Sequence, residues 1–233
     1  MPVKQKRTLY TEVAYLLAMI VMPLGVAMMK VADLGLSMIV APAYLIHLKV
    51  SQFLPWFSFG TAEYVLQGLL LVALFICLGR CKLTLFFSFV TALLYGLALD
   101  GCLLFISLIP AESIVMRIGL YALGMLLSCS GVALFFGAYI PPCVYDLFVK
   151  EAAAHFSVDR TKFKIAYDTA SFLVSLLLSV SFFGLWPLEG IGIGTFVCAL
   201  INGRLIGALA RGIERFFVYE DRLPRLRGFF EKH

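Results

Sequence analysis

Charged side chains are scarce in this sequence, and their scarcity limits the solvent in which the chain can fold. Asp, Glu, Lys and Arg make up 14% of the 233 residues, whereas 62% are hydrophobic and the mean hydropathy is +0.97. A soluble domain is about half apolar and about one quarter charged. The chain has too few polar side chains to cover a surface that faces water, so we expect it to fold within the lipid bilayer.

Motifs of the common enzyme classes are also lacking. The sequence has no nucleophile elbow, Walker loop, pair of metal-binding histidines or Gly-rich dinucleotide turn. Its six cysteines lie mostly inside apolar runs at unrelated spacings, which is typical of small buried hydrophobes. His47 and His155 are out of register with each other and are interpreted as interfacial. We therefore expect neither an enzyme nor a metal or cofactor.

Long hydrophobic runs dominate what is present. Six of them are long enough to cross about 30 Å of hydrocarbon as helices, at residues 9–31, 61–79, 84–109, 112–140, 164–184 and 192–215. The first exceeds a signal-peptide core, and we expect it to be retained. Stretches 36–48 and 142–155 read as helices too short to cross, either re-entrant or interfacial. The predicted fold class is an all-α polytopic membrane helix bundle.

Lysine and arginine are distributed unevenly between the loops. With the N-terminus inside, fifteen of the nineteen fall on the cytoplasmic side: Lys4, Lys6, Arg7, Arg80, Lys82, Lys150, Arg160, Lys162, Lys164, Arg211, Arg215, Arg222, Arg225, Arg227 and Lys232. This bias predicts a multi-pass protein of the bacterial inner membrane with both termini in the cytoplasm. The net charge of +5 then reflects topology and requires no nucleic-acid partner.

The two halves of the sequence, 1–110 and 111–233, share a pattern. "GVAMM" begins at Gly25 and "GVALF" at Gly131, and "TALLYG" (91–96) aligns with "CALING" (198–203). Each half reads as a long span, a short helix and two further spans, with the second carrying a basic cytoplasmic tail. Three crossings is an odd number, so the second half must enter from the opposite face. The pattern predicts a 3+3 inverted-topology repeat, as in many secondary transporters.

Several segments carry a resemblance to a known family. "GVAMMKVADLGLS", "FSFGTAEYVLQGLLL", "GVALFFGAYIPPCVYDLFV" and "EGIGIGTFVCALINGRLIG" resemble the YczE/YyaS/YitT-like bacterial membrane proteins over nearly the whole chain. That family often has Pro–aromatic–Asp after the first "LG", where this sequence has Met38, Ile39 and Val40; only Asp146 of the second half remains. The resemblance implies a multi-pass fold and a function described as uncharacterised or transport-related.

Arg204 is the most conspicuous candidate site residue. It lies about 18 Å into the last span, near the midplane, where insertion of a charge costs about 2.5–3.5 kcal/mol. With Asn202 it could bind an anionic or carbonyl-bearing solute. The alternatives are a structural ion pair with Asp146 or Asp168, or extension of the arginine toward the cytoplasm beside Arg211.

Four other charged residues are candidates. Glu63 and Asp168 occupy equivalent early turns in the two halves, where they either cap helices or serve in proton coupling or alternating gates, and Lys164 is placed to pair with Asp168. Together with Asp146, these two acids are candidate substrate-binding residues. Asp100 and Arg117 flank a tight turn between two spans. We expect these two to form a structural ion pair that pins the helical hairpin.

We expect a small-solute secondary transporter or exporter with a midplane site between the repeats. The alternative is a substrate-binding or regulatory membrane subunit of a larger complex, and the third hypothesis is lipid handling. The expected partners are the bilayer and a small-molecule solute, and a homodimer is left open.

The topology can be tested by cysteine labelling. In a background without the native cysteines, Ser51→Cys and Asp159→Cys should react with an impermeant maleimide from opposite faces of sealed vesicles. Labelling of both from one face would contradict the inverted repeat.

Overall fold

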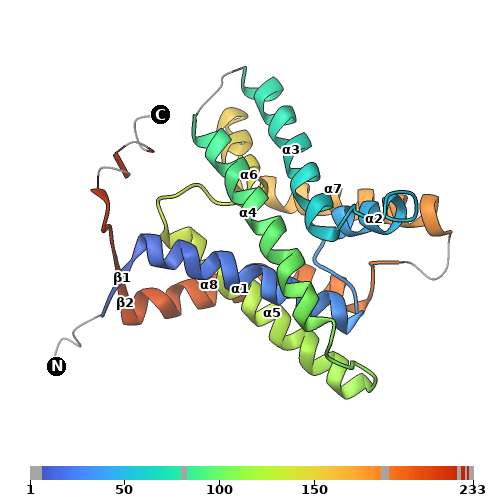
Figure 1. Ribbon diagram of the computed structural model, residues 1–233. Coiled ribbons are helices and arrows are strands. Elements are labelled where there is room, and N and C mark those ends of the chain that lie inside the picture. The colour runs from blue at the N-terminus through green and yellow to red at the C-terminus, as the bar shows by residue number, and fades with distance from the viewer. Residues whose placement is uncertain (1–6, 80–82, 185–188, 225–226, 229, 231–233) are drawn as a thin grey trace.

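The structure is a computed structural model that describes residues 7–79, 83–184, 189–224, 227–228 and 230. Several basic residues used to predict the topology lie outside this part of the chain, namely Lys4, Lys6, Arg80, Lys82, Arg225 and Lys232. In the described part, one four-residue strand precedes eight helices and a second four-residue strand follows them (Figure 1). The prediction of an all-α helix bundle is confirmed.

Six of the helices are long and apolar enough to cross a bilayer. They are α1 (Thr11–Ala32), α3 (Phe59–Leu78), α4 (Leu83–Ile106), α5 (Ile114–Gly137), α7 (Arg160–Phe183) and α8 (Ile193–Phe216). Each agrees with a predicted run to within a few residues at either end. The two shorter helices, α2 (Ala41–Val50) and α6 (Val144–His155), also form where expected.

Helix ends follow local capping chemistry. Ser58 precedes α3, and its hydroxyl accepts a hydrogen bond from the Thr61 amide at 3.0 Å; Ser113 does the same for Met116 at the start of α5, at 3.2 Å. These serines satisfy amides that have no partner within the helix. Gly79 ends α3 in the left-handed conformation, with φ of 60°, which glycine adopts without steric cost.

Helices α1 and α5 cross at the centre of the molecule, and glycine makes the crossing close. A methyl group on Gly25 would overlap the backbone of Gly124 and Ser128, and one on Gly131 would overlap Met22. The aligned halves pair Gly25 with Gly131 and Met22 with Ser128, 106 positions apart in each case. Exchanging the two halves therefore converts one contact into the other, as a two-fold relation between α1 and α5 requires.

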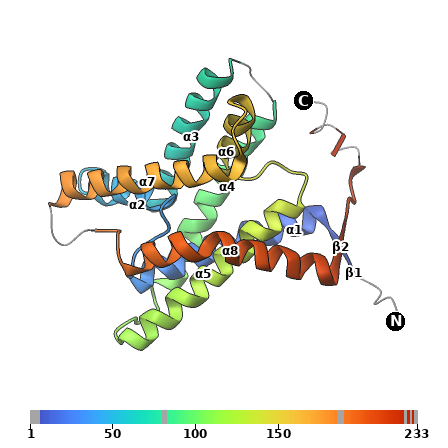
Figure 2. The same cartoon turned by 180° about the vertical axis from the view of Figure 1, so that it is seen from behind.

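The two short helices each pack on helices of both halves. α6, from the second half, packs on α3 and α4 and also on α7, whereas α2, from the first half, packs on α7 and α3. Figure 2 shows α7 and α8 on the outside of the molecule and separated from each other over most of their length. In the first half, by contrast, α3 and α4 pack closely through Gly60 and Gly96.

A two-stranded parallel sheet, which the sequence did not predict, joins the ends of the described chain. β1 (Arg7–Tyr10) pairs with β2 (Phe217–Glu220), with Arg7 opposite Phe217. Just beyond it, Glu12 accepts hydrogen bonds from the Leu223 amide at 2.8 Å and the Tyr139 hydroxyl at 2.9 Å. The start of α1 and the end of α8 therefore lie side by side.

The glycine contact at the central crossing can be tested with one methyl group. Gly25→Ala should lower the free energy of unfolding by about 1–3 kcal/mol, because the added group overlaps backbone atoms that cannot move away cheaply. Gly119→Ala on α5 is the matched control, since nothing lies within 4 Å of its added methyl, and it should be neutral or slightly stabilising. Denaturant unfolding in detergent measures both. Equal effects would contradict the close crossing.

Candidate functional site

Two polar side chains are completely buried on one face of α3. Glu63 and Gln67 are both 0% exposed and are separated by one helical turn. The Tyr145 hydroxyl of α6 donates a hydrogen bond to Glu63 Oε2 at 3.0 Å, and the Val144 amide donates to Gln67 Oε1 at 3.0 Å. The side chains of α3 thus hold the first turn of α6.

Helix α4 holds the turn that leads into α6. The Thr91 hydroxyl donates to the Pro141 carbonyl at 3.0 Å, and the Ser88 hydroxyl donates to the Pro142 carbonyl. Tyr15 of α1 hydrogen-bonds to Thr91 at 2.7 Å and so extends the network to the central crossing. Proline has no amide hydrogen, so Pro141 and Pro142 offer only their carbonyl oxygens. The two hydroxyls satisfy these oxygens.

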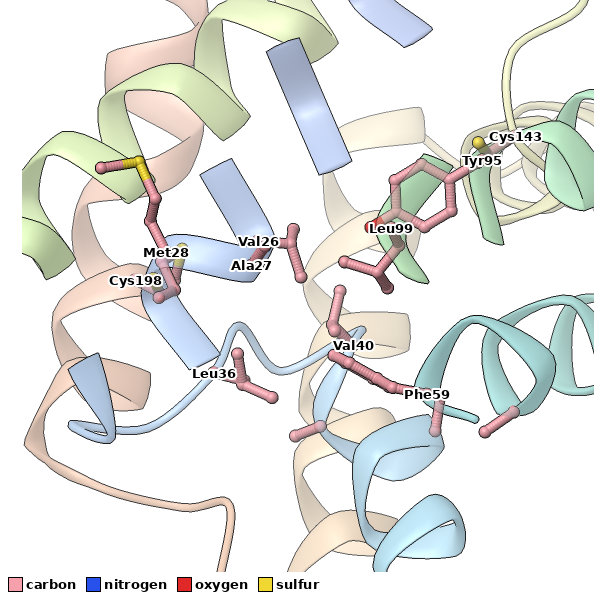
Figure 3. Close-up of a cluster of buried hydrophobic side chains, with 14 of the residues drawn as sticks. Val26, Ala27, Met28, Leu36, Val40, Phe59, Tyr95, Leu99, Cys143 and Cys198 are labelled. Carbon is pink, nitrogen blue, oxygen red and sulfur yellow. The ribbon is translucent and has the colours of Figure 1, made fainter. Parts of the chain in front are cut away.

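Tyr95 of α4 completes the buried group, which we name the Glu63 cluster: Glu63, Gln67, Tyr95 and Tyr145. Tyr95 is 1% exposed. Figure 3 shows it next to Cys143 and among Leu99, Val40 and Val26, at the meeting point of α1, α4 and the segment before α2. Tyr95 lies near the middle of the 24-residue α4, and Glu63 lies in the second turn of α3; both helices are long and apolar enough to cross a bilayer.

Three polar atoms of the Glu63 cluster have no hydrogen-bond partner. They are Glu63 Oε1, Gln67 Nε2 and the Tyr95 hydroxyl. A buried polar group without a partner costs about 1–3 kcal/mol, so three in one cluster are unusual in a folded protein. Together they offer a carboxylate acceptor, an amide donor and a hydroxyl that can do either. These groups could recognise a small polar molecule by hydrogen bonding.

The Tyr145 hydroxyl donates its hydrogen to Glu63 Oε2. The second oxygen of the same carboxyl group, Oε1, has no hydrogen-bond partner.

The acids predicted as site residues occupy different environments. Glu63 lies at the centre of the cluster, and Asp146 follows Tyr145 in the first turn of α6. Asp168, on α7, pairs with Lys164 at 3.4 Å, as the sequence suggested. The structure therefore brings Glu63 and the Asp146 turn together, whereas Asp168 has a partner within its own helix.

Arg204 and Asn202 do not share a face of α8. The Asn202 side chain points toward α5, where its carbonyl oxygen accepts a hydrogen bond from the Cys129 thiol at 3.4 Å. Arg204 is exposed on the outer side of the helix. The two were expected to act together at one solute site, and the structure places neither in the Glu63 cluster.

The predicted ion pair between Asp100 and Arg117 is wrong. Asp100 caps α3 instead: its Oδ1 accepts from the Gly60 amide at 2.8 Å, and its Oδ2 accepts from the Ser58 hydroxyl. Arg117 bonds Asp33 Oδ2 at 2.8 Å and the Ala32 carbonyl at 2.7 Å, at the end of α1. Both side chains satisfy free backbone groups at helix ends. The prediction considered only that the two residues lie at similar depth in one hairpin, and this could not reveal the competing partners.

Three members of the cluster were missed from the sequence: Gln67, Tyr95 and Tyr145. Gln67 could have been found from its spacing, since it lies one turn after Glu63 on the same face. Tyr95 is aligned with Asn202 in the "TALLYG" and "CALING" segments, so a polar residue recurs there. Tyr145 follows the double proline directly and gave no separate signal.

Metal binding finds no support in the described residues, where no three His, Cys, Asp or Glu side chains gather as a metal site would require.

An all-α bundle with six apolar helices of membrane-spanning length defines an integral membrane protein. The chain belongs to a family of unknown function, DUF6198, whose family model matches residues 9–211. No curated protein and no solved structure matches it significantly.

The unpartnered atoms of the cluster lead to opposite expectations for two Tyr→Phe variants. Tyr145→Phe removes the donor to Glu63 Oε2 and should lower the free energy of unfolding by about 1–3 kcal/mol. Tyr95→Phe removes a buried hydroxyl without a partner and should leave stability unchanged or raise it. Denaturant unfolding of the two variants provides the comparison. A similar loss in both would show that the Tyr95 hydroxyl is bonded and unavailable to a ligand.

Proposed function

We propose that this protein is a small-solute secondary transporter of the bacterial inner membrane, with its substrate site at the Glu63 cluster. The observation that carries the proposal is the group of three unpartnered polar atoms, Glu63 Oε1, Gln67 Nε2 and the Tyr95 hydroxyl, buried at membrane depth. Polar groups inside a membrane protein are costly and usually mark a substrate or ion pathway.

The chemistry of the cluster favours a particular kind of solute. A ligand that donates an N–H or O–H to Glu63 and presents a carbonyl or hydroxyl oxygen to Gln67 would satisfy both. The carbonyl-bearing solute expected from the sequence fits Gln67. An anion was expected because of Arg204, which is not in the cluster, and the Glu63 carboxyl disfavours one. We therefore propose a neutral or cationic solute that carries both donors and acceptors.

The architecture supports a transporter more than a static binding protein. Contacts at the α1–α5 crossing, and two short helices that each pack on helices of both halves, follow the pattern of two related halves. With the Lys/Arg asymmetry, this arrangement supports an inverted-topology repeat with both termini in the cytoplasm. In such folds a substrate site lies near the midplane, next to interrupted helices. The resemblance to YczE/YyaS/YitT-like proteins agrees with this interpretation.

A second candidate function keeps the same site without transport. As a substrate-binding or regulatory subunit of a larger complex, the protein would bind solute in the cluster and pass it to a partner. The separated α7 and α8 favour this alternative, because they leave helix faces open to another subunit.

Removal of the Glu63 charge tests the proposal. The purified protein is screened by thermal shift against primary amines, amides, hydroxylated solutes and, for comparison, carboxylates, and each stabilising compound is then tested for uptake into proteoliposomes. Glu63→Gln should abolish the shift and reduce uptake at least tenfold. Its apo melting temperature should stay unchanged or rise, because the variant replaces a buried acid with an amide of the same shape that keeps an acceptor for Tyr145.

Glu112→Gln, in the exposed loop between α4 and α5, is the control with the same chemical change and should behave as the wild type. Binding that depends on Glu63 without uptake would favour the subunit function. An unchanged thermal shift in Glu63→Gln would overturn the assignment of the site.

A further inference from the structure

Three arginines form a line along the outer face of α8. Arg204, Arg211 and Arg215 are all exposed, and spacings of seven and four residues place them within about 40° of one another around a helix. We name this line the α8 arginine stripe. Figure 2 shows α8 in front of α1 and α5, with its outer face uncovered.

Depth distinguishes Arg204 from the other two. It is near the middle of the 24-residue α8, about 18 Å along the helix axis from Phe216. An arginine side chain can extend along apolar surface to reach the interface from Arg211 or Arg215, but not from that depth. The positive-inside rule therefore accounts for Arg211 and Arg215 and not for Arg204.

The repeat shows what the fold needs at these positions. Aligning "TALLYG" with "CALING" pairs each residue of α4 with one 107 positions later. The counterparts of Arg204, Arg211 and Arg215 are Leu97, Leu104 and Leu108, which are 65%, 71% and 77% exposed. Leu97 and Leu104 lie on α4 and Leu108 lies just beyond its end, so the corresponding positions of the first half are apolar and exposed. Packing does not require arginine there, so the cationic stripe has a purpose of its own.

The surface beside the stripe can accept a ligand. Nothing lies within 4 Å of a methyl group built on Gly203, and only Arg211 Nη1, at 3.5 Å, approaches one on Gly207. The Arg211 side chain therefore runs back along the helix over Gly207 toward Arg204. Within the described part of the chain, Arg204 itself forms no hydrogen bond or ion pair, and its guanidinium is available.

Three acids of the long helices have partners within the chain: Glu63 is bonded to Tyr145, Asp100 to the start of α3, and Asp168 to Lys164. Glu214 lies ten residues along α8 from Arg204, which in a parallel dimer is a difference of about 15 Å in depth. These four acids are poorly placed to pair with Arg204 of a second copy, which favours a counter-charge from the membrane.

We infer that the α8 arginine stripe binds the phosphate of an anionic phospholipid, drawn from the cytoplasmic leaflet along Arg215 and Arg211 to Arg204. The planar guanidinium presents paired donors that match phosphate oxygens. The acyl chains can lie against the apolar outer face of α8, where Ile193 and Leu200 are 81% and 73% exposed. This site is separate from the Glu63 cluster and does not depend on the proposed transport.

The probe is dioleoyl phosphatidylglycerol, compared with dioleoyl phosphatidylcholine, in mixed micelles of neutral detergent with the full-length protein. The anionic lipid should raise the melting temperature of the wild type more than the zwitterionic lipid does. Arg204→Gln should lose at least half of this difference, and Arg204→Lys should lose part of it. Arg7→Gln, which removes an exposed positive charge in β1, should retain it.

Arg204→Leu provides a second variant that should fold, since leucine occupies the counterpart position 97. The inference is overturned if Arg204→Gln and Arg204→Leu keep the full lipid response, or if Arg7→Gln loses as much. Equal stabilisation by soluble glycerol phosphate would also overturn it, because the ligand would then be a free anion. So would conversion of a dimer to a monomer by Arg204→Gln, measured by light scattering, because a second copy would then cover the stripe.

Discussion

The fold depends on one constraint: irregular backbone at membrane depth must find hydrogen-bond partners within the protein, because the hydrocarbon provides none. The turn before α6 meets this need through Ser88, Thr91 and Gln67, which satisfy two proline carbonyls and the Val144 amide. The segment before α2 meets it through backbone, since the Leu36 amide donates to Gly190 and the Leu34 carbonyl accepts from Gly194. These bonds fix where each short helix begins.

The same constraint explains why the candidate site lies where α3 and α4 pack on α6. Side chains that hold a buried turn must be polar, and they must come from neighbouring helices, so polar residues accumulate around the first turn of α6. Glu63 and Tyr145 extend this set beyond what the turn itself requires. Around the segment before α2, backbone pairing leaves little need for polar side chains. The Glu63 cluster could therefore develop from a structural set of polar residues, and this was possible only around the first turn of α6.

Much of the fold could be predicted from the sequence because it depends on hydrophobicity averaged over long stretches of the chain. Hydrophobic runs and their lengths located all six long helices, and prolines located the start of α6. The Glu63 cluster could be predicted only in part. Glu63 stood out as a charge in a span, but Tyr95 and Tyr145 are common residues in apolar helices, and only three-dimensional packing shows that they meet.

Partner choice among charged side chains was the least predictable feature. Asp100 and Arg117 were paired because they flank one turn, yet each serves a helix end that belongs to a different part of the chain. Free backbone groups at helix ends compete with side-chain charges for partners, and in a bilayer that competition is decided by which group would otherwise be unsatisfied. Within the described part of the chain, Arg204 takes part in none of these bonds, because no helix end lies within its reach. The two halves therefore differ both in packing and in their polar residues: α3 of the first half places Glu63 against α6, whereas α8 of the second half carries exposed arginines.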